Sequence, residues 1–294
     1  MKNESYKGAI IHLASVAFMS SSLVLNKFAL ERIGPYEAVV INSLFALIFT
    51  IGINQKFRPA AEDKKSANNW RLLIPMGLAN GIGLVLLFYS LNEIGPISVG
   101  FIGRFYIVFA IVISILFLKE RYGRLEYLLM GLVVAGTFLF SWNDEKSELL
   151  GATAAILFTL LFAISNTLAQ KARQTSSAKF VLLTNNVAAF AFALVYFFVI
   201  QSGHLSFDLK AYSYAIISAL LGSTIGLLLY YYGLIYLSFS KANIIRSLQP
   251  LFVAALAFPF FPKSFTAIQW FSALVIFLSV IGLSIIKTSR NPSP

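Results

Sequence analysis

Residues 78–91 read LANGIGLVLLFYSL, and residues 221–234 read LGSTIGLLLYYYGL. The two stretches are identical at seven of fourteen positions when the chain is shifted by 143 residues, and Gly83 then corresponds to Gly226. Each stretch belongs to an apolar run of the length that a membrane-spanning helix needs, about 20 residues. Asn42 corresponds to Asn185 at the same shift. We therefore predict that the chain consists of a unit that occurs twice.

The composition excludes a water-soluble globule. The 294 residues are 58% hydrophobic and 12% charged, about half the charged fraction that is usual in soluble domains. Apolar runs between Pro, Gly and charged residues predict ten helices: 9–30, 36–55, 72–91, 97–118, 125–142, 149–170, 179–200, 212–236, 242–261 and 266–286.

Five predicted helices fall in each half of the chain. Because five is odd, the second half enters the membrane from the opposite side, and the two repeats are inverted. We therefore predict an all-α integral membrane protein with ten transmembrane helices in two inverted five-helix repeats, residues 1–147 and 148–294.

The Lys and Arg residues predict the orientation. Of the 23, sixteen lie in segments on the same side as the termini, four lie on the other side and three fall within spans. Positive residues gather on the cytoplasmic side, so both termini are predicted to be cytoplasmic, in a multi-pass protein of the bacterial inner (plasma) membrane. The formal charge of +11 is spread over short loops, which disfavours a nucleic-acid partner.

The sequence lacks the residues that several kinds of functional site require. The chain has no cysteine and two histidines, His12 and His204, which excludes disulfides, thiolate sites and a usual metal cluster. No Asp or Glu lies deep within a predicted span, so carboxylate chemistry within the membrane is excluded as well. We expect no catalytic residues, metal or cofactor. His12 could couple protons to transport, although a lone histidine near the interface is more often incidental.

The chain resembles the drug/metabolite transporter superfamily, in its EamA-type branch of ten-helix transporters. Three segments carry the resemblance: GPYEAVVINS at 34–43, SLNEIGPISVGFIGRF continuing to LFLKER at 90–121, and YGLIYLSFSKANIIRSLQPLF at 232–252. The resemblance implies a glutamate that ends the first-half segment, here Glu120, and a proline in the second half, here Pro250. The chain departs from the pattern at Lys263, Ile107 and Asn42, and the resemblance does not specify the substrate.

Two arginines are the main candidates for substrate binding. Arg104 lies seven residues into a predicted helix, roughly 10 Å deep, and Arg246 lies roughly 6 Å deep at nearly the equivalent place in the second half. Pro250 has no N–H for the carbonyl of Arg246, so we predict a break or hinge there. A buried arginine is costly unless it faces a cavity or a partner, which favours an anion ligand. Snorkelling, or bonds to backbone carbonyls, remains the structural alternative.

The other predicted substrate-binding residues are polar or aromatic side chains within or at the ends of the spans: Tyr89, Tyr106, Tyr232, Asn80, Asn166, Gln249 and Lys27. Tyr89 and Tyr232 are related by the repeat and are candidates for a cavity wall. The buried amides could either orient a ligand or bond across helices. Lys27 lies three residues from a helix end, and its stem can reach the headgroups.

The sequence therefore predicts a secondary transporter of a small polar metabolite, preferably anionic, that works by alternating access between inverted repeats. Its partners would be this substrate and the lipid bilayer. Two alternatives are an exporter of amino acids or varied hydrophobic compounds with structural arginines, and a lipid-modifying enzyme, for which Ser223 has no deep base. A passive channel is disfavoured. Cargo, direction, driving ion and oligomeric state are not specified by the sequence.

Overall fold

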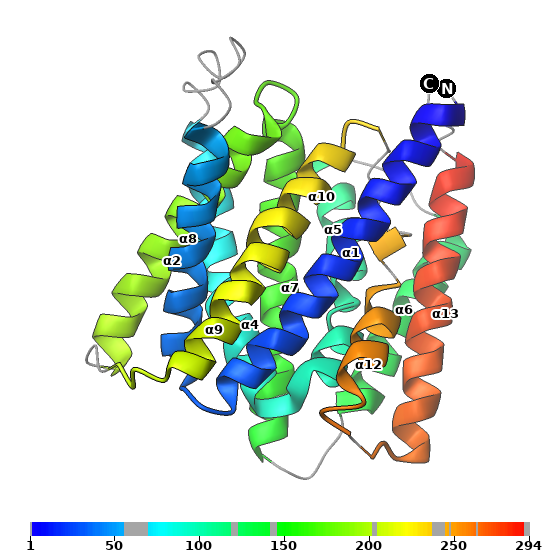
Figure 1. Ribbon diagram of the computed structural model, residues 1–294. Coiled ribbons are helices and arrows are strands. Elements are labelled where there is room, and N and C mark those ends of the chain that lie inside the picture. The colour runs from blue at the N-terminus through cyan, green and yellow to red at the C-terminus, as the bar shows by residue number, and fades with distance from the viewer. Residues whose placement is uncertain are drawn as a thin grey trace.

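The computed structural model describes residues 2–55, 70–118, 123–141, 146–201, 205–236, 245–246, 248–262 and 264–290. Within these ranges the chain is helical and has no strand. The helices in chain order are α1 (Lys2–Leu30), α2 (Pro35–Gln55), α4 (Trp70–Ile102), α5 (Phe105–Leu118), α6 (Arg124–Ser141), α7 (Lys146–Ala172), α8 (Ala178–Gln201), α9 (Leu209–Ser218), the π-helix η1 (Ala219–Gly226), α10 (Leu227–Gly233), α12 (Gln249–Ala257) and α13 (Ala267–Arg290). Figure 1 shows them as one tilted bundle.

The predicted membrane-spanning character is confirmed. Six stretches are long and apolar enough to cross a bilayer: Tyr6–Leu30, Pro35–Asn54, Trp70–Ile102, Glu148–Ala172, Ala178–Val199 and Leu209–Gly233. α13 contributes a shorter apolar helix, Ala267–Leu283. The protein is therefore an all-α, multi-pass integral membrane protein.

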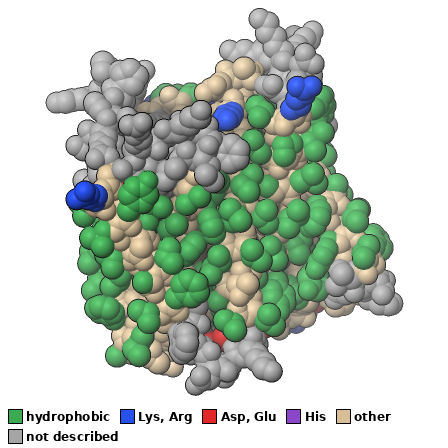
Figure 2. Space-filling view, turned by 180° about the vertical axis from the view of Figure 1, so that it is seen from behind, with side chains coloured by type: hydrophobic (Ala, Val, Ile, Leu, Met, Phe, Trp, Pro, Cys, Tyr) green, Lys and Arg blue, Asp and Glu red, His purple; other side chains and the backbone are tan. Residues whose placement is uncertain are grey.

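The outer surface agrees with this conclusion. In Figure 2 hydrophobic side chains cover most of the visible face, and the Lys and Arg side chains drawn there lie mainly toward one end. Large apolar side chains are exposed on the helices of the rim; examples are Val199 on α8 and Phe271 and Leu278 on α13. Such a surface is stable against lipid chains and not against water.

Two predicted helices in the first half have different limits in the structure. The predicted gap between 72–91 and 97–118 lies inside α4, where the chain bends at Gly95 with φ 74° and ψ 170° and continues through Pro96. Glycine adopts a positive φ without steric cost, so Gly95 interrupts the helical conformation, and the kink between the two helical segments of α4 lies in the gap that was predicted between 72–91 and 97–118. The prediction of one unbroken helix over 97–118 is wrong, because α4 ends at Ile102 and α5 begins at Phe105.

The second half has a break at the corresponding place. A helix was predicted over 242–261, with a break near Arg246 because of Pro250. Residues 245–246 are helical, and the regular helix α12 starts at Gln249 with Pro250 in its first turn. Proline suits a first turn because its fixed φ fits the helix and the N–H that it lacks has no partner within α12 itself. Both halves therefore carry a helix start close to an arginine.

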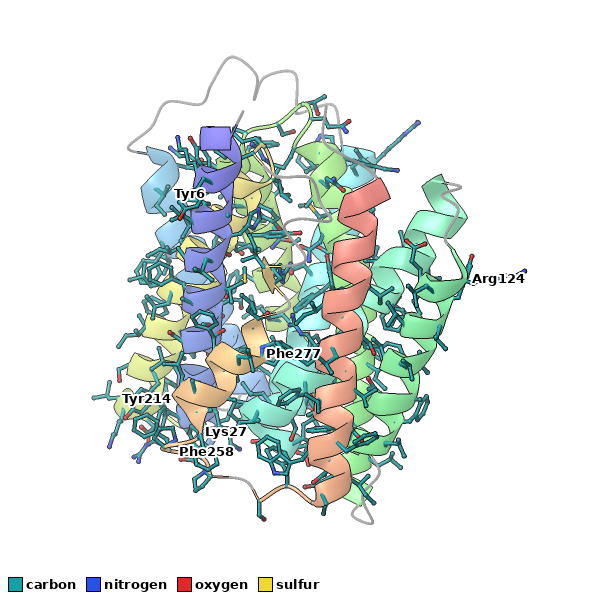
Figure 3. The ribbon with its side chains drawn as sticks, turned by 90° about the vertical axis from the view of Figure 1, so that its right-hand side faces the viewer. Tyr6, Lys27, Arg124, Tyr214, Phe258 and Phe277 are labelled. Carbon is teal, nitrogen blue, oxygen red and sulfur yellow. The ribbon has the colours of Figure 1, made fainter. Side chains whose placement is uncertain are left out.

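The ends of the chain lie together. The first turns of α1 and the last turns of α13 are at the same end of the bundle in Figure 1. Figure 3 shows α1 running from Tyr6 at that end to Lys27 near the opposite end. α13 packs mainly along α6, which carries Arg124 at the outer edge of the bundle. α6 and α13 thus lie at the edge of the bundle, and the other helices form its middle.

α9, η1 and α10 form one continuous helical stretch whose middle is wound as a π-helix. This stretch lies beside α1, and the contact is close because a Cβ at Gly222 would fall 2.2 Å from Ser22 Oγ. Ser15 Oγ donates a hydrogen bond of 2.7 Å to the carbonyl of Gly226. Wide turns of this kind leave backbone carbonyls partly unpaired, and here polar side chains of neighbouring helices reach them.

Candidate functional site

A cavity of about 170 Å³ lies between the two halves of the chain. This volume is well above the roughly 15 Å³ that one water molecule needs. Its walls come from α1, α2, α4 and α5 in the first half, and from α7, α8, η1, α10, Arg246 and Gln249 in the second. The cavity is therefore the place where the two repeated units meet.

Arg104 enters the cavity from the break between α4 and α5. Its backbone N–H bonds to the carbonyl of Phe101 at 3.0 Å, a short-range bond that tightens the chain where the regular helix stops. Gly103 precedes it, and a Cβ at this position would fall 2.8 Å from the carbonyl oxygen of Val99. The break thus requires a small residue, and it aims the guanidinium group across the cavity instead of along the helix.

The Arg104 guanidinium group reaches the second half of the chain. Its Nη1 donates a short hydrogen bond to the backbone carbonyl of Arg246, and its Nη2 donates one of 3.0 Å to Oε1 of Gln249. The carbonyl of Arg246 is the one that Pro250 cannot pair within a helix. A cation from the first half therefore occupies an acceptor that the proline leaves free in the second half.

Arg246 is held by aromatic rings. Its guanidinium carbon lies 4.5 Å from the ring centroid of Tyr230 and 5.3 Å from that of Tyr106. Both distances suit cation–π attraction, which is worth about 2 kcal/mol or more where water is excluded. Arg246 Nη1 and Arg104 Nε are shielded from solvent and have no hydrogen-bond partner among the described residues. Each arginine thus keeps a donor for another group.

No acid neutralises these two cations. In the part of the chain that the structure describes, neither arginine forms an ion pair with a carboxylate, and the cavity wall contains no Asp or Glu. Buried Glu37 lies elsewhere, near the end of the bundle opposite the termini. There Oε1 of Glu37 accepts hydrogen bonds from Tyr212 Oη at 2.6 Å and from the backbone N–H of Ser206 at 2.9 Å. The cavity interior is therefore positively charged.

The remaining wall is partly polar and partly aromatic. Asn80, Asn166 and Gln249 contribute amides, and Phe158 and Phe162 contribute ring surface. Such a wall can accept the apolar part of a small molecule while a few polar groups fix its orientation.

Six of the predicted site residues meet at the cavity: Arg104, Arg246, Tyr106, Asn80, Asn166 and Gln249. Three do not line it. Tyr89 lies near Tyr36, and Tyr232 is 43% exposed with its hydroxyl 3.4 Å from that of Tyr236. Lys27 Nζ donates to the carbonyl of Asn92 at 3.2 Å near the end opposite the termini.

A polar cluster beside the cavity was not predicted as part of the site. Asn42, which is fully buried, donates hydrogen bonds of 3.2 Å to the carbonyl of Ala215 and to Ser218 Oγ, and one of 3.3 Å to Asn26 Oδ1. It accepts one of 3.1 Å from Ser223 Oγ. The correspondence of Asn42 with Asn185 was the available signal, but a sequence match does not specify which helices the side chain joins.

The end opposite the termini is tied by an ion pair between two loops. Arg32 Nη2 lies 2.8 Å from Asp208 Oδ2, and Asp208 also accepts a hydrogen bond from the backbone N–H of Ala211 at the start of α9. The hydrogen bond from Arg32 is the main cause that lowers the pKa of Asp208 below its usual value. Glu120, Lys263 and His204 lie outside the described residues.

Comparison with known proteins identifies the architecture. The EamA-like transporter family matches residues 6–142 and again residues 149–285. The second match starts 143 residues after the first (149 against 6) and ends 143 residues after it (285 against 142), which is the shift found in the sequence. No curated protein matches the chain.

One solved structure, described only as "Crystal structure of protein", is similar in fold. It superposes with a TM-score of 0.69 at 10% sequence identity, over 98% of this chain and 99% of the other. At this identity the likeness concerns the fold alone.

Proposed function

The chain belongs to the EamA-like transporter family, and from this premise we propose that it carries a small organic anion through the cavity between its two halves. Family membership makes it a membrane transporter of small molecules rather than an enzyme. The nature of the cargo, the inverted arrangement of the repeats and alternating access are the proposal.

The proposal rests on the positive charge of the cavity. Arg104 and Arg246 both line it, and no carboxylate does so within the described part of the chain. Bonds between a guanidinium group and a carboxylate or phosphate are roughly twice as strong as bonds between neutral groups. An anion is therefore the ligand that best offsets the cost of keeping two cations away from water.

The geometry supports an exchange of partners at Arg104. In the structure Arg104 donates to two neutral acceptors, the carbonyl of Arg246 and the amide oxygen of Gln249. An anion is a stronger hydrogen-bond acceptor than a carbonyl or an amide, so it can replace both. It can also accept hydrogen bonds from Arg104 Nε and Arg246 Nη1, which have no partner among the described residues. The ligand would thus compete with the contact that joins the two halves.

Alternating access follows from this arrangement. Two repeats of five helices each would be inverted, with the breaks before α5 and α12 at nearly equivalent places. Release of the Arg104 contact would let one half tilt against the other and expose the cavity to the opposite side. By the distribution of Lys and Arg, both termini would face the cytoplasm of a bacterium.

The test measures thermal stabilisation of the purified protein by compounds of one size and different charge: benzoate, phenylphosphate, benzamide and benzylamine. We expect benzoate and phenylphosphate to raise Tm, and Arg104→Ala to abolish this rise. Arg124→Ala, at the exposed edge of α6, is the matched control and should bind as the wild type does. Stabilisation by benzylamine or benzamide alone would contradict the anion proposal.

A second candidate is an exporter of amino acids or varied hydrophobic compounds. It is favoured by one observation, that Arg104 already satisfies two donors within the protein and so has a structural role. It predicts that Arg104→Lys and Arg246→Lys leave the ligand profile unchanged, whereas an anion site should lose affinity because lysine cannot make bidentate bonds.

A further inference from the structure

His12 on α1 is a buried imidazole. Its side chain is fully buried, no side chain among the described residues bonds to either ring nitrogen, and the backbone of Gly233 is its nearest polar neighbour. It lies six residues after Tyr6, where the apolar span begins, so it is roughly 9 Å from the cytoplasmic end of that span. Histidine is the side chain that changes charge most readily near neutral pH.

The ring of His12 is linked to the cavity through Tyr230. The two rings meet edge to face with centroids 5.6 Å apart, and Tyr230 carries the Arg246 guanidinium group at 4.5 Å. On the other side the backbone of α10 comes close, since a Cβ at Gly233 would fall 2.6 Å from His12 Nε2. Only glycine leaves room for the imidazole at this place.

Arg246 is the charged group that shares the Tyr230 ring with His12. Of the helices packed against α1, η1 and α12 carry no titratable side chain. α10 presents the tyrosines Tyr230 and Tyr231. The other described titratable side chains of α1 and of the helices packed against it are Tyr6, Lys7 and Lys27 on α1, Tyr36 and Glu37 on α2, Arg71, Tyr89 and Glu93 on α4, Lys210, Tyr212 and Tyr214 on α9, and Tyr232 on α10.

We propose that His12 is the proton site of this transporter, and that proton uptake by its imidazole accompanies binding of the anion at Arg246. The inference rests on the proposed function. With the cavity empty, a charge on the ring would face the like charge of Arg246 without a counter-ion. An anion bound beside Arg246 removes this electrostatic repulsion. A ring nitrogen then takes a proton from water on the open side and returns it to water on the other side when the anion leaves.

Coupling of this kind is reciprocal. If the anion favours the imidazolium form, the proton favours anion binding by the same factor. The consequence is co-transport of one proton with one anion in the same direction. It supplies a driving ion without a membrane-embedded carboxylate, which the described spans do not offer in their interior.

The chain allows a direct test by nuclear magnetic resonance, because it has two histidines. In His204→Gln protein labelled with ¹⁵N-histidine, the imidazole signals report the protonation of His12 alone. At constant pH between 5.5 and 7, saturating benzoate should raise the ratio of charged to neutral imidazole at least tenfold, and benzamide should leave it unchanged. In Arg246→Gln the ring should take up its proton at the same pH with or without benzoate.

The two proposals fail differently. If benzoate stabilises the protein but leaves the His12 signals unchanged, the proton site is refuted and the anion site stands. If neither benzoate nor phenylphosphate binds, both proposals are refuted. A second measurement uses phenylphosphate counterflow in vesicles: His12→Gln should keep the exchange but lose accumulation driven by a pH gradient, and retention of that accumulation would overturn the inference.

Discussion

The guanidinium group of Arg104 donates a hydrogen bond to the backbone carbonyl of Arg246, the carbonyl for which Pro250 has no N–H. The bond joins the two halves of the chain at the cavity. It also satisfies a carbonyl that would otherwise be unpaired within the membrane, where an unpaired group costs several kcal/mol. Arg104 therefore completes the backbone of the other half, and under the proposed function it also offers charge to a ligand.

Pro250→Ala should strengthen anion binding. Residue 250 would gain an N–H for the Arg246 carbonyl, and Arg104 would be freed from one bond that a ligand must otherwise replace. A net hydrogen bond is worth about 1 kcal/mol, so benzoate affinity should rise about fivefold in a thermal titration. Pro75→Ala in α4, at a proline that does not line the cavity, is the control and should bind as the wild type does.

Gln249→Glu should weaken anion binding. The introduced carboxylate would lie where Oε1 of Gln249 now accepts from Arg104 at 3.0 Å, and it would neutralise the cation. We expect benzoate affinity to fall at least tenfold, equivalent to about 1.4 kcal/mol. Gln249→Leu removes the acceptor without adding charge and should change affinity less than threefold. Equal affinities for Gln249→Glu and Gln249→Leu would show that charge in the cavity does not determine binding.

Gly222→Ala should destabilise the protein. The added Cβ would lie 2.2 Å from Ser22 Oγ and 2.4 Å from Ser22 Cβ, so α1 and η1 would have to separate. Overpacking of this kind costs about 1 to 3 kcal/mol in the free energy of unfolding. Gly131→Ala on α6 is the matched control: its Cβ meets nothing within 4 Å, and helix propensity predicts a gain of up to about 1 kcal/mol. Unfolding in denaturant measures both, and a neutral Gly222→Ala would contradict the close approach.

Asn42→Leu and Asn185→Leu should differ although the two positions correspond in the repeat. Asn42 makes four hydrogen bonds to other helices, and its loss removes the hydrogen bond that the buried Asn26 Oδ1 accepts. We expect a loss of about 1 to 3 kcal/mol. The side chain of Asn185 is buried and unpaired among the described residues, so its replacement should cost less than about 1 kcal/mol. Equal losses in denaturant unfolding would refute the assignment.

The Arg32–Asp208 pair should stabilise the protein only above about pH 4. The pKa of Asp208 is lowered in the folded protein, mainly by the hydrogen bond from Arg32. A lowered pKa contributes stability above the unfolded value, about 3.9, and that stability is lost as the pH falls through the folded value. The difference in Tm between wild type and Asp208→Asn should therefore be constant from pH 7 to 5 and shrink as the pH falls below about 4. A difference that does not change with pH in this acid range would assign the effect to another cause.

The sequence alone determined the properties that arise locally along the chain. Apolar runs predicted the membrane spans, because a helix satisfies its own backbone and needs only apolar side chains to enter lipid. A constant shift of 143 residues predicted the two units that the family match confirms. The missing helical hydrogen bond at the Arg246 carbonyl was also predictable, since helical hydrogen bonds join residues four apart in the chain and residue 250 is a proline.

Only the tertiary structure decided which side chains meet. Tyr89 and Tyr232 correspond in the repeat, yet neither lines the cavity, whereas Tyr106 and Tyr230 hold Arg246. The break beside Arg104 was missed because apolarity continues through it, whereas Pro250 gave a signal for the break before Gln249. Which face of a spanning helix points inward depends on its rotation and tilt against neighbours far along the chain, and hydropathy within one helix carries little information about either.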